Sequence, residues 1–196
     1  MDCFVQQTYP SRELLILDDM DCPAFSDIPK IPNVRLFRLP KMTIGEKRNI
    51  GVSRAEGDVI CHWDSDDWNP STRIANQLHE LLSSGKRVSG CSQLLFWDLD
   101  LKHGYRYTHP HPAYAIGTTL MYHRSWSLSH PFPASNIGED NLFVHQSRSV
   151  LHTIPDLGII AGVHSGNTSK KVLSHAEFAK VPLTAFPNEA HSWMHD

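Results

Sequence analysis

The chain has 196 residues, a formal net charge of −3, and 40% apolar and 20% charged side chains. This composition is typical of a globular protein, and the length suits one domain or one domain with a short tail. The weakly acidic balance excludes a general nucleic-acid binder, and every apolar run is too short to cross a bilayer.

The first predicted strand ends in two acidic residues. Residues 13–17 form a short apolar run, which predicts a buried parallel strand that ends at Asp18 and Asp19. Residues 21–40 are rich in proline and polar residues, so we expect a loop there with one short strand at 34–39.

A helix and a second strand follow. Thr43 and Glu46 have the spacing of a capping box, which predicts a helix over residues 43–56 with Gly57 at its C-terminal cap. Residues 59–63 then predict another buried strand, and this strand also ends in carboxylates.

The rest of the chain continues the alternation of helices and strands. Asn69 as cap and Pro70 as first residue predict a helix that ends at Gly85. Further elements are predicted as strands at 87–91, 105–108, 118–122, 151–154 and 159–163, a helix from Glu139 to about Gln146, and a weakly patterned tail after 170.

This order of elements predicts an α/β domain with a mostly parallel sheet. We expect the domain to cover residues 1–168, followed by a C-terminal tail at 169–196. Ligands of such sheets bind outside the carboxyl ends of the strands, and both acidic clusters fall at ends of that kind.

The cysteines and the N-terminal residues suggest a compartment. Cys3, Cys22, Cys61 and Cys91 form no CxxC pair, so neither a zinc knuckle nor a redox motif is indicated. The first residues lack the basic and apolar regions of a signal peptide. We therefore expect a cytoplasmic protein with free thiols.

The acidic loop, residues 64–67, is the strongest candidate for a binding site. Its carboxylates, Asp64, Asp66 and Asp67, repel one another, and a hard divalent cation would neutralise them. Mg²⁺ or Mn²⁺ prefers carboxylate oxygens together with phosphates and water. In an extended segment Asp64 and Asp66 project to the same side. The alternative is that all three are turn and cap residues, which are common roles for aspartate.

Several segments, in order, resemble family 2 glycosyltransferases. They are QQTYP at 6–10 with ELLILDD at 13–19, GEKRNIG at 45–51 with AEGDVI at 55–60, DSDDWNP at 64–70, and GED at 138–140. The resemblance covers roughly residues 4–168. It implies a GT-A-like, Rossmann-related three-layer α/β/α fold with a mixed, mostly parallel sheet. Relative to the family pattern, the first strand and most of the first helix have no counterpart in the sequence.

The resemblance also implies roles for individual residues. Asp18 would contact the nucleotide base, Lys47 and Arg48 would lie at the base or diphosphate, and Asp64 would face the ribose. Asp66, with Asp64 beside it, would hold Mn²⁺ or Mg²⁺, and His164 resembles a late histidine that meets the metal or diphosphate. Asp140 would be the general base, supported by Glu139.

Each role has a structural alternative. Lys47 and Arg48 fit a solvated helix face equally well. Glu139 and Asp140 also suit the N-terminus of a helix, where acidic side chains are favoured. His164 could instead be a hydrogen-bonded histidine of the core.

The family resemblance implies a metal-dependent, inverting transfer of a sugar. The donor would be a nucleotide-sugar, with a UDP-sugar favoured, and the acceptor would be a hydroxyl group of a saccharide or other molecule. Two other functions stay open. One is a non-catalytic nucleotide-binding or interaction domain. The other is a haloacid-dehalogenase-like phosphatase, whose Asp-x-Asp spacing Asp64 and Asp66 match, although Trp68 does not fit that motif.

Overall fold

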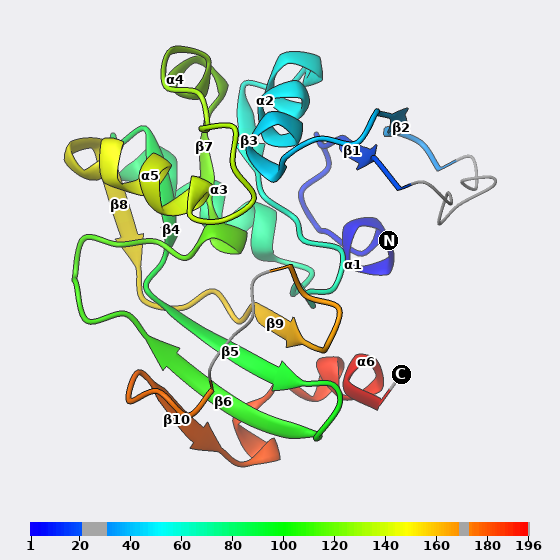
Figure 1. Cartoon of the computed structure of the whole chain (residues 1–196), viewed down its shortest axis with the longest axis vertical. Helices are drawn as coiled ribbons and strands as arrows, with labels where there is room; N and C mark the ends of the chain where they lie inside the picture. Colours follow the sequence, from blue (N-terminus) through cyan, green and yellow to red (C-terminus); the bar gives the residue numbers. More distant parts are fainter. Residues whose placement is uncertain (21–30, 169–172, 196) are drawn as a thin grey trace.

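The computed structural model describes residues 1–20, 31–168 and 173–195 (Figure 1). Its strands are β1 (Leu14–Asp18), β2 (Val34–Arg38), β3 (Val59–Cys61), β4 (Val88–Cys91), β5 (Gln93–Asp98), β6 (His103–Thr108), β7 (Met121–His123), β8 (Leu151–Ile154), β9 (Ile160–Val163) and β10 (Phe178–Val181). Its α-helices are α1 (Asp2–Val5), α2 (Ile44–Arg54), α3 (Arg73–Ser83), α4 (Arg124–Ser129), α5 (Glu139–Gln146) and α6 (His191–His195).

The described strands form three sheets. Strands β1 and β2 make a parallel pair, and the two four-stranded sheets have the orders β3-β7-β4-β8 and β10-β6-β5-β9. Both larger sheets mix directions: β4 pairs in parallel with β8 and antiparallel with β7, while β5 pairs in parallel with β9 and antiparallel with β6. The α/β class with a mixed sheet is therefore confirmed, although among the described strands the antiparallel pairings outnumber the parallel ones expected to dominate.

Helices cover both faces of the β3-β7-β4-β8 sheet. Tyr122 of β7 packs against Phe143 of α5, with ring centroids 4.9 Å apart. Helix α3 packs against β4 and β7 of the same sheet, and its Leu78 lines a cavity together with Met121, the residue before Tyr122. Because successive strand residues point to opposite faces, α5 and α3 lie on opposite sides of the sheet. This arrangement is the expected three-layer order.

The second four-stranded sheet has its own core, which includes residues near the C-terminus. Trp97 of β5 packs against Phe186 and donates a hydrogen bond from Nε1 to the Met194 carbonyl at 3.1 Å. Met194 of α6 is fully buried. Strand β10 extends the sheet by pairing with β6. Figure 1 shows β10 and α6 lying along this lower sheet.

Most predicted elements lie where the sequence places them. The strand at 34–39 is confirmed as β2, the helix at 43–56 as α2, and the helix at Glu139 as α5. The capping box of Thr43 is present in full, although the C-terminal cap is Ala55 and not Gly57. The rest of the loop predicted at 21–40 includes residues 21–30, which lie outside the described residues.

The predicted helix start at Asn69 and Pro70 is wrong, because α3 begins only at Arg73. Asn69 is buried, and its side-chain oxygen accepts a hydrogen bond from the Arg73 guanidinium. The Pro70 carbonyl accepts one from Gln7 Nε2 at 2.7 Å. Both residues thus make tertiary contacts before the helix begins.

Two strands expected to be buried are only half-buried. Residues 14–17 of β1 and all three residues of β3 keep partial access to solvent. A cavity of about 920 Å³, lined by both strands, explains the difference. By contrast, every residue of β4 is buried.

No helix among the described residues is long and apolar enough to cross a membrane. Cys3, Cys61 and Cys91 are free thiols, and Cys22 lies outside the described residues.

Substitutions at Phe143 and Leu142, two neighbouring residues of α5, test the packing of the core. Phe143 is fully buried, whereas Leu142 keeps 52% of its surface exposed. Phe143→Ala should lower the free energy of unfolding by about 3–5 kcal/mol, because it leaves a cavity among packed rings. Leu142→Ala should change it by less than about 0.5 kcal/mol. Urea denaturation measures both, and equal losses would contradict this packing.

Candidate functional site

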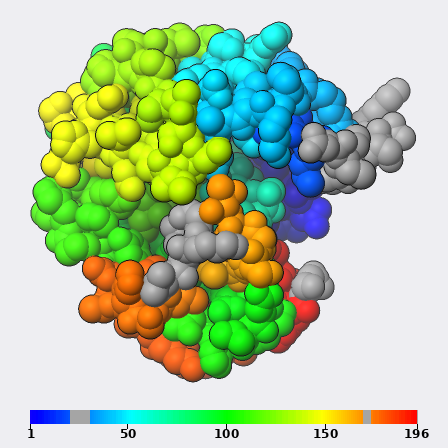
Figure 2. Space-filling view, viewed as in Figure 1, coloured from blue at the N-terminus to red at the C-terminus, as the bar shows by residue number. Residues whose placement is uncertain are grey.

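The acidic loop leaves β3 and meets the end of β9. His164 Nε2 lies 3.2 Å from Asp66 Oδ2, and Asn167 Nδ2 donates to the same oxygen at 2.7 Å. The segment after β9, coloured orange in Figure 2, reaches the surface in the middle of that face. Two predicted metal ligands, Asp66 and His164, are thus brought together from positions far apart in the sequence.

The His164 ring has a fixed orientation. Its Nδ1 accepts a hydrogen bond from the Gly166 amide at 3.1 Å. Because an amide N–H can only donate, Nδ1 carries no proton, and a neutral ring carries its proton on Nε2, facing Asp66. His164 therefore lies at the site and is not the core histidine of the alternative interpretation.

Asp67 points away from Asp66 and holds the loop in place. Its carboxylate accepts hydrogen bonds from the Thr118 hydroxyl and from the Gly162 amide, the latter at 3.1 Å. Burial raises the pKa of Asp67 well above its usual value, and the negative charge of Asp64 adds to the increase. Asp67 is thus a structural residue. Residues 65 and 66 form a turn, so the loop is not the extended segment assumed from the sequence.

Gly162 allows the loop to approach β9 closely. A Cβ atom at this position would lie 2.3 Å from the Asp66 carbonyl oxygen, which is far inside van der Waals contact. The backbone path of the loop therefore depends on the missing side chain.

Arg48 lies near two carboxylates, those of Glu139 and Asp64. Its Nη1 is 2.9 Å from Glu139 Oε1, and its guanidinium lies over the Phe132 ring at 5.4 Å from the centroid. Burial raises the pKa of Glu139, while the charge of Arg48 opposes that increase. Asp64 is solvent-accessible on one side, yet close protein atoms desolvate its carboxylate and raise its pKa, again opposed by Arg48. Arg48 is therefore not on a solvated helix face.

Lys47, one residue earlier on α2, points to the end of β1. Its Nζ lies 2.8 Å from Asp19 Oδ1, and the Met42 amide donates to the other carboxylate oxygen of Asp19 at 3.3 Å. Burial alone would raise the pKa of Asp19, but these hydrogen bonds and the lysine charge lower it. Asp18 is also buried and pairs with Arg38 of β2.

Asp140 is held against a glycine. A Cβ atom on Gly117, the first residue of the 3₁₀ turn Gly117–Thr119, would lie 2.1 Å from Asp140 Oδ2. The Gly117 carbonyl in turn contacts His62 Nδ1 at 2.9 Å. A carbonyl only accepts, so Nδ1 carries the proton, and Nε2, 3.0 Å from the Tyr122 hydroxyl, is the acceptor.

His62 is a neutral side chain of the core. Burial lowers its pKa well below the usual value, and the charge of Arg48 lowers it further. It therefore fixes the turn beneath Asp140 without adding charge to the site.

A buried arginine supports the loop from behind. Arg73 is completely buried, donates from Nη2 to the Thr118 carbonyl at 2.9 Å, and lies 5.1 Å from the centroid of the Trp63 ring. Asn69 and Gln77 supply its other oxygen partners. Through Thr118 this network reaches Asp67.

The site offers part of a ligand set for a divalent cation. Among residues 1–20, 31–168 and 173–195, no group of three or more His, Cys, Asp or Glu side chains could hold a metal ion. Asp66 and His164 nevertheless supply one carboxylate and one imidazole at a common point. Mg²⁺ and Mn²⁺ sites often use one or two protein ligands and complete the shell with phosphate oxygens and water. Asp66 fits such a site as it stands. His164 would present a lone pair at Nε2 only with its ring proton moved to Nδ1, which would end the contact with the Gly166 amide.

Several residues of the site could not be singled out from the sequence. They act through tertiary contacts that no local pattern in the sequence indicates, and they are Asn167, Thr118, Gly117 and Gly162. The pairing of Lys47 with Asp19, and not with Asp18, depends on side-chain direction at the end of β1.

Comparison with known proteins gives the family. A family model described as glycosyl transferase family 2 matches residues 2–132. The chain belongs to this family. The expected family membership is confirmed, while Glu139, Asp140 and His164 lie beyond the matched residues.

Two curated relatives match this family 2 chain. The cholesterol galactosyltransferase of Borreliella burgdorferi is 25% identical over 117 residues, which cover 57% of this chain and 32% of that protein. An uncharacterized glycosyltransferase of Haemophilus influenzae is 31% identical over 86 residues, covering 41% of this chain and 34% of that protein. The chain therefore spans about a third of the length of the curated relatives it matches.

Solved structures confirm the GT-A fold. S. aureus TarS 1-349 in complex with UDP matches with a TM-score of 0.63 and 16% identity, covering 83% of this chain and 55% of that one. The complex of the same protein with UDP-GlcNAc gives a TM-score of 0.65 and 16% identity, with 85% and 54% covered. At this level of identity the likeness establishes the fold.

Gly162 and Gly57 provide a test of the loop geometry. Gly162→Ala should lower the free energy of unfolding by about 1–3 kcal/mol, because the added methyl group has no space beside the Asp66 carbonyl. At Gly57 the nearest atom to an added Cβ is 3.6 Å away, an ordinary contact, so Gly57→Ala should be nearly neutral. Denaturant titration compares the two variants, and a neutral Gly162→Ala would show that the loop takes another path.

Proposed function

We propose that this chain forms the donor-binding and catalytic core of a glycosyltransferase that moves a sugar from a nucleotide-sugar to an acceptor hydroxyl. The observation that carries the proposal is the contact between Asp66 and His164 beside the cluster of Arg48, Glu139 and Asp64. The site of this family 2 chain thus combines acidic, basic and imidazole side chains, which suit a diphosphate group with its bound cation.

A UDP-sugar is the favoured donor. The relative in Borreliella burgdorferi is named a galactosyltransferase, and the structural neighbour TarS was solved with UDP and with UDP-GlcNAc. In this chain Asp18 would contact the base, Asp64 would face the ribose, and Lys47 and Arg48 would balance the charge of the diphosphate. The ion pairs that now occupy Lys47 and Arg48 keep both side chains in place for that role.

Asp66 and His164, with Asp64 nearby, are the proposed holders of Mn²⁺ or Mg²⁺. Such an ion, when bound, offsets the negative charge that develops on the departing nucleoside diphosphate. Asn167 keeps the Asp66 carboxylate oriented through its hydrogen bond.

Asp140 is the proposed general base. It would accept the proton of the acceptor hydroxyl as the oxygen attacks the anomeric carbon, which contributes roughly a hundred- to ten-thousand-fold to the rate. One base and a direct displacement invert the anomeric configuration. Gly117 and His62 fix the wall against which the carboxylate lies.

A cytoplasmic location also remains part of the proposal. The free thiols of Cys3, Cys61 and Cys91 suit a reducing compartment. A non-catalytic nucleotide-binding domain is the second candidate, favoured by the open cavity between β1 and β3 next to the donor residues. The family match gives no support to the phosphatase interpretation.

Asp140→Asn tests the base. The variant should lose sugar transfer by about a hundredfold or more, because the amide cannot accept the hydroxyl proton, and should keep its affinity for UDP. Transfer is measured with radiolabelled UDP-sugars and UDP binding by calorimetry. Leu142→Ala, an exposed change on the same helix, is the matched control and should keep full turnover. Normal turnover by Asp140→Asn would reject the assignment, and UDP binding without transfer by the unaltered chain would favour the non-catalytic candidate.

Asp66→Asn tests the metal ligand. The affinity for UDP in the presence of Mn²⁺ should fall by about tenfold or more, and a chelator should weaken binding to the unaltered protein in the same way. Asp58→Asn, a change at an exposed carboxylate before β3, should leave both values unchanged. UDP binding that is equally tight with and without the chelator would contradict a role for the cation.

A further inference from the structure

Helix α2 lies directly against residues 132–138, the segment that leads into α5, and we call these residues the approach segment. The Gly45 amide donates a hydrogen bond to the Ser135 carbonyl at 3.1 Å. A Cβ atom on Gly45 would lie 1.9 Å from the Pro133 carbonyl oxygen, so the two backbones touch at this glycine. Figure 1 shows the approach segment running beside α2.

Asn49, one turn further along α2, makes two hydrogen bonds to the start of the approach segment. Its Nδ2 donates to the Phe132 carbonyl at 2.8 Å, and its Oδ1 accepts from the Phe132 amide at 2.9 Å. The side-chain amide thus pairs with both main-chain groups of one residue, as a neighbouring strand does in a sheet. Phe132 is 3% exposed, so these main-chain groups need partners inside the protein. Asn49 therefore fixes Phe132 relative to α2.

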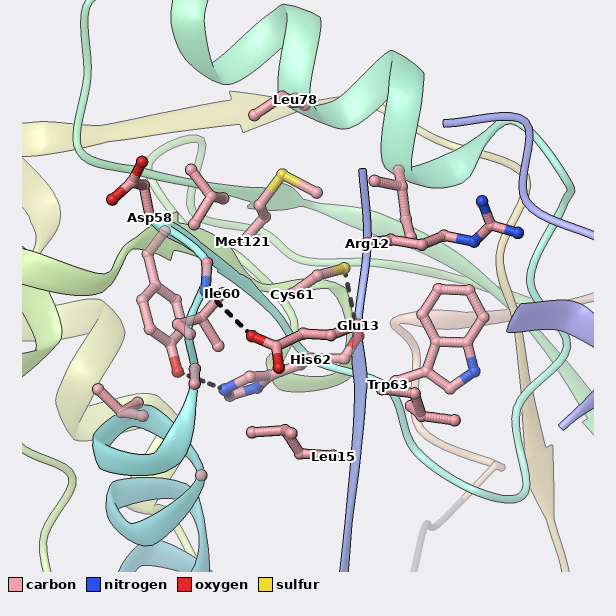
Figure 3. Close-up of a pocket in the computed structure, with 18 of the residues that line it drawn as sticks. Arg12, Glu13, Leu15, Asp58, Ile60, Cys61, His62, Trp63, Leu78 and Met121 are labelled. Atoms are coloured by element: carbon pink, nitrogen blue, oxygen red, sulfur yellow. Dashed lines mark hydrogen bonds between the residues drawn. The ribbon is translucent and has the colours of Figure 1, made fainter. Parts of the chain in front are cut away.

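The Phe132 ring contacts three parts of the proposed site. It stacks on Phe143 of α5, three residues after Asp140, with ring centroids 4.3 Å apart and planes 14° apart. Its centroid lies 5.5 Å from the ring centroid of His62, which fixes the turn against which Asp140 lies. His62 is labelled in Figure 3, where a dashed line marks a hydrogen bond of its ring. The Arg48 guanidinium lies 5.4 Å from the Phe132 centroid. A shift of Phe132 therefore displaces groups of the donor side and of the base side.

We propose that Asn49 is a positioning residue for the transfer reaction. By holding Phe132 in place, it sets the distance between the donor-side Arg48 and the general base Asp140. This inference rests on the proposed function. Arg48 and Asn49 are neighbours on α2, so one turn of this helix carries the donor-side cation and also holds the segment that leads to the base. An error of about 1 Å between reacting groups lowers a rate by up to about a hundredfold.

Asn49→Ala tests the inference with the full chain. The kcat for transfer from a UDP-sugar should fall by about ten- to a hundredfold, because the base is displaced from the reacting groups. The affinity for UDP, measured by calorimetry, should stay unchanged, because Lys47 and Arg48 remain on α2. Ser53→Ala is the matched control on the same helix. Its hydroxyl bonds to the Ile50 carbonyl within α2, so this variant should keep both values.

Asn49→Asp separates the hydrogen bonds from the space that the side chain fills. The carboxylate has nearly the size of the amide and still accepts from the Phe132 amide, but it cannot donate to the Phe132 carbonyl. The kcat of this variant should therefore fall as well, with the affinity for UDP again unchanged. Full turnover by Asn49→Asp would show that filling the space is sufficient, and the inference would be wrong.

Hydrogen exchange gives a measurement that does not depend on transfer. In Asn49→Ala the amides of Phe132 and of residues 143–146 in α5 should exchange about tenfold or more faster than in the unaltered chain. The amides of α3 should keep their rates, because α3 packs on the other side of the sheet. If the unaltered chain transfers no sugar, the proposed function fails, while this comparison still decides whether Asn49 holds the approach segment.

Three further results would overturn the inference. They are a normal kcat in Asn49→Ala, unchanged exchange of its α5 amides, and exchange that accelerates equally in α3 and α5. The last result would show that Asn49 supports the whole fold and does not position the base in particular.

Discussion

The buried carboxylate of Asp67 ties the two four-stranded sheets together. One of its oxygens accepts from Thr118, in the turn before β7, and the other accepts from Gly162 of β9. Trp68, the residue after Asp67, forms an antiparallel β-bridge with Ile160 of β9, which adds main-chain hydrogen bonds to the same link. Burying a carboxylate costs free energy, which these hydrogen bonds offset only while both sheets keep their positions. The acidic loop is therefore the junction of the molecule as well as its candidate site.

This junction explains why the loop residues differ in role. Asp67 is turned inward, so Asp66 faces outward toward His164 and Asn167. Asp64 lies nearer to Arg48, whose charge also acts on Glu139 and His62. One arginine on α2 thus acts on the charges of His62, just after β3, of Asp64 in the acidic loop and of Glu139 on α5. Its removal would leave buried Glu139 and exposed Asp64 without that counter-charge.

Local sequence patterns could predict the elements whose ends are set by residues close in the sequence. The capping box at Thr43 and the glycine before Glu139 specify helix starts within a few residues, and both helices are found. Strand β5 and helices α4 and α6 gave no clear pattern because tertiary contacts define them, as for Trp97 and Met194. The start of α3 was misplaced for the same reason, since Asn69 serves Arg73 and not the helix end. At the site, residue types indicate Asp66 and His164. Gly117 and Gly162 matter because neighbouring atoms occupy the space that a side chain would need, and the sequence does not show such close approaches.

The short strand β3 influences the distance between the proposed donor site and the proposed general base. It carries the acidic loop on its end, and His62, in the same stretch of backbone, anchors the turn that supports Asp140. The proposed donor site and the proposed general base are thus both positioned by the same short stretch of backbone. Thermal motion that displaces this stretch shifts both reaction partners in step, so their separation is better preserved than either position.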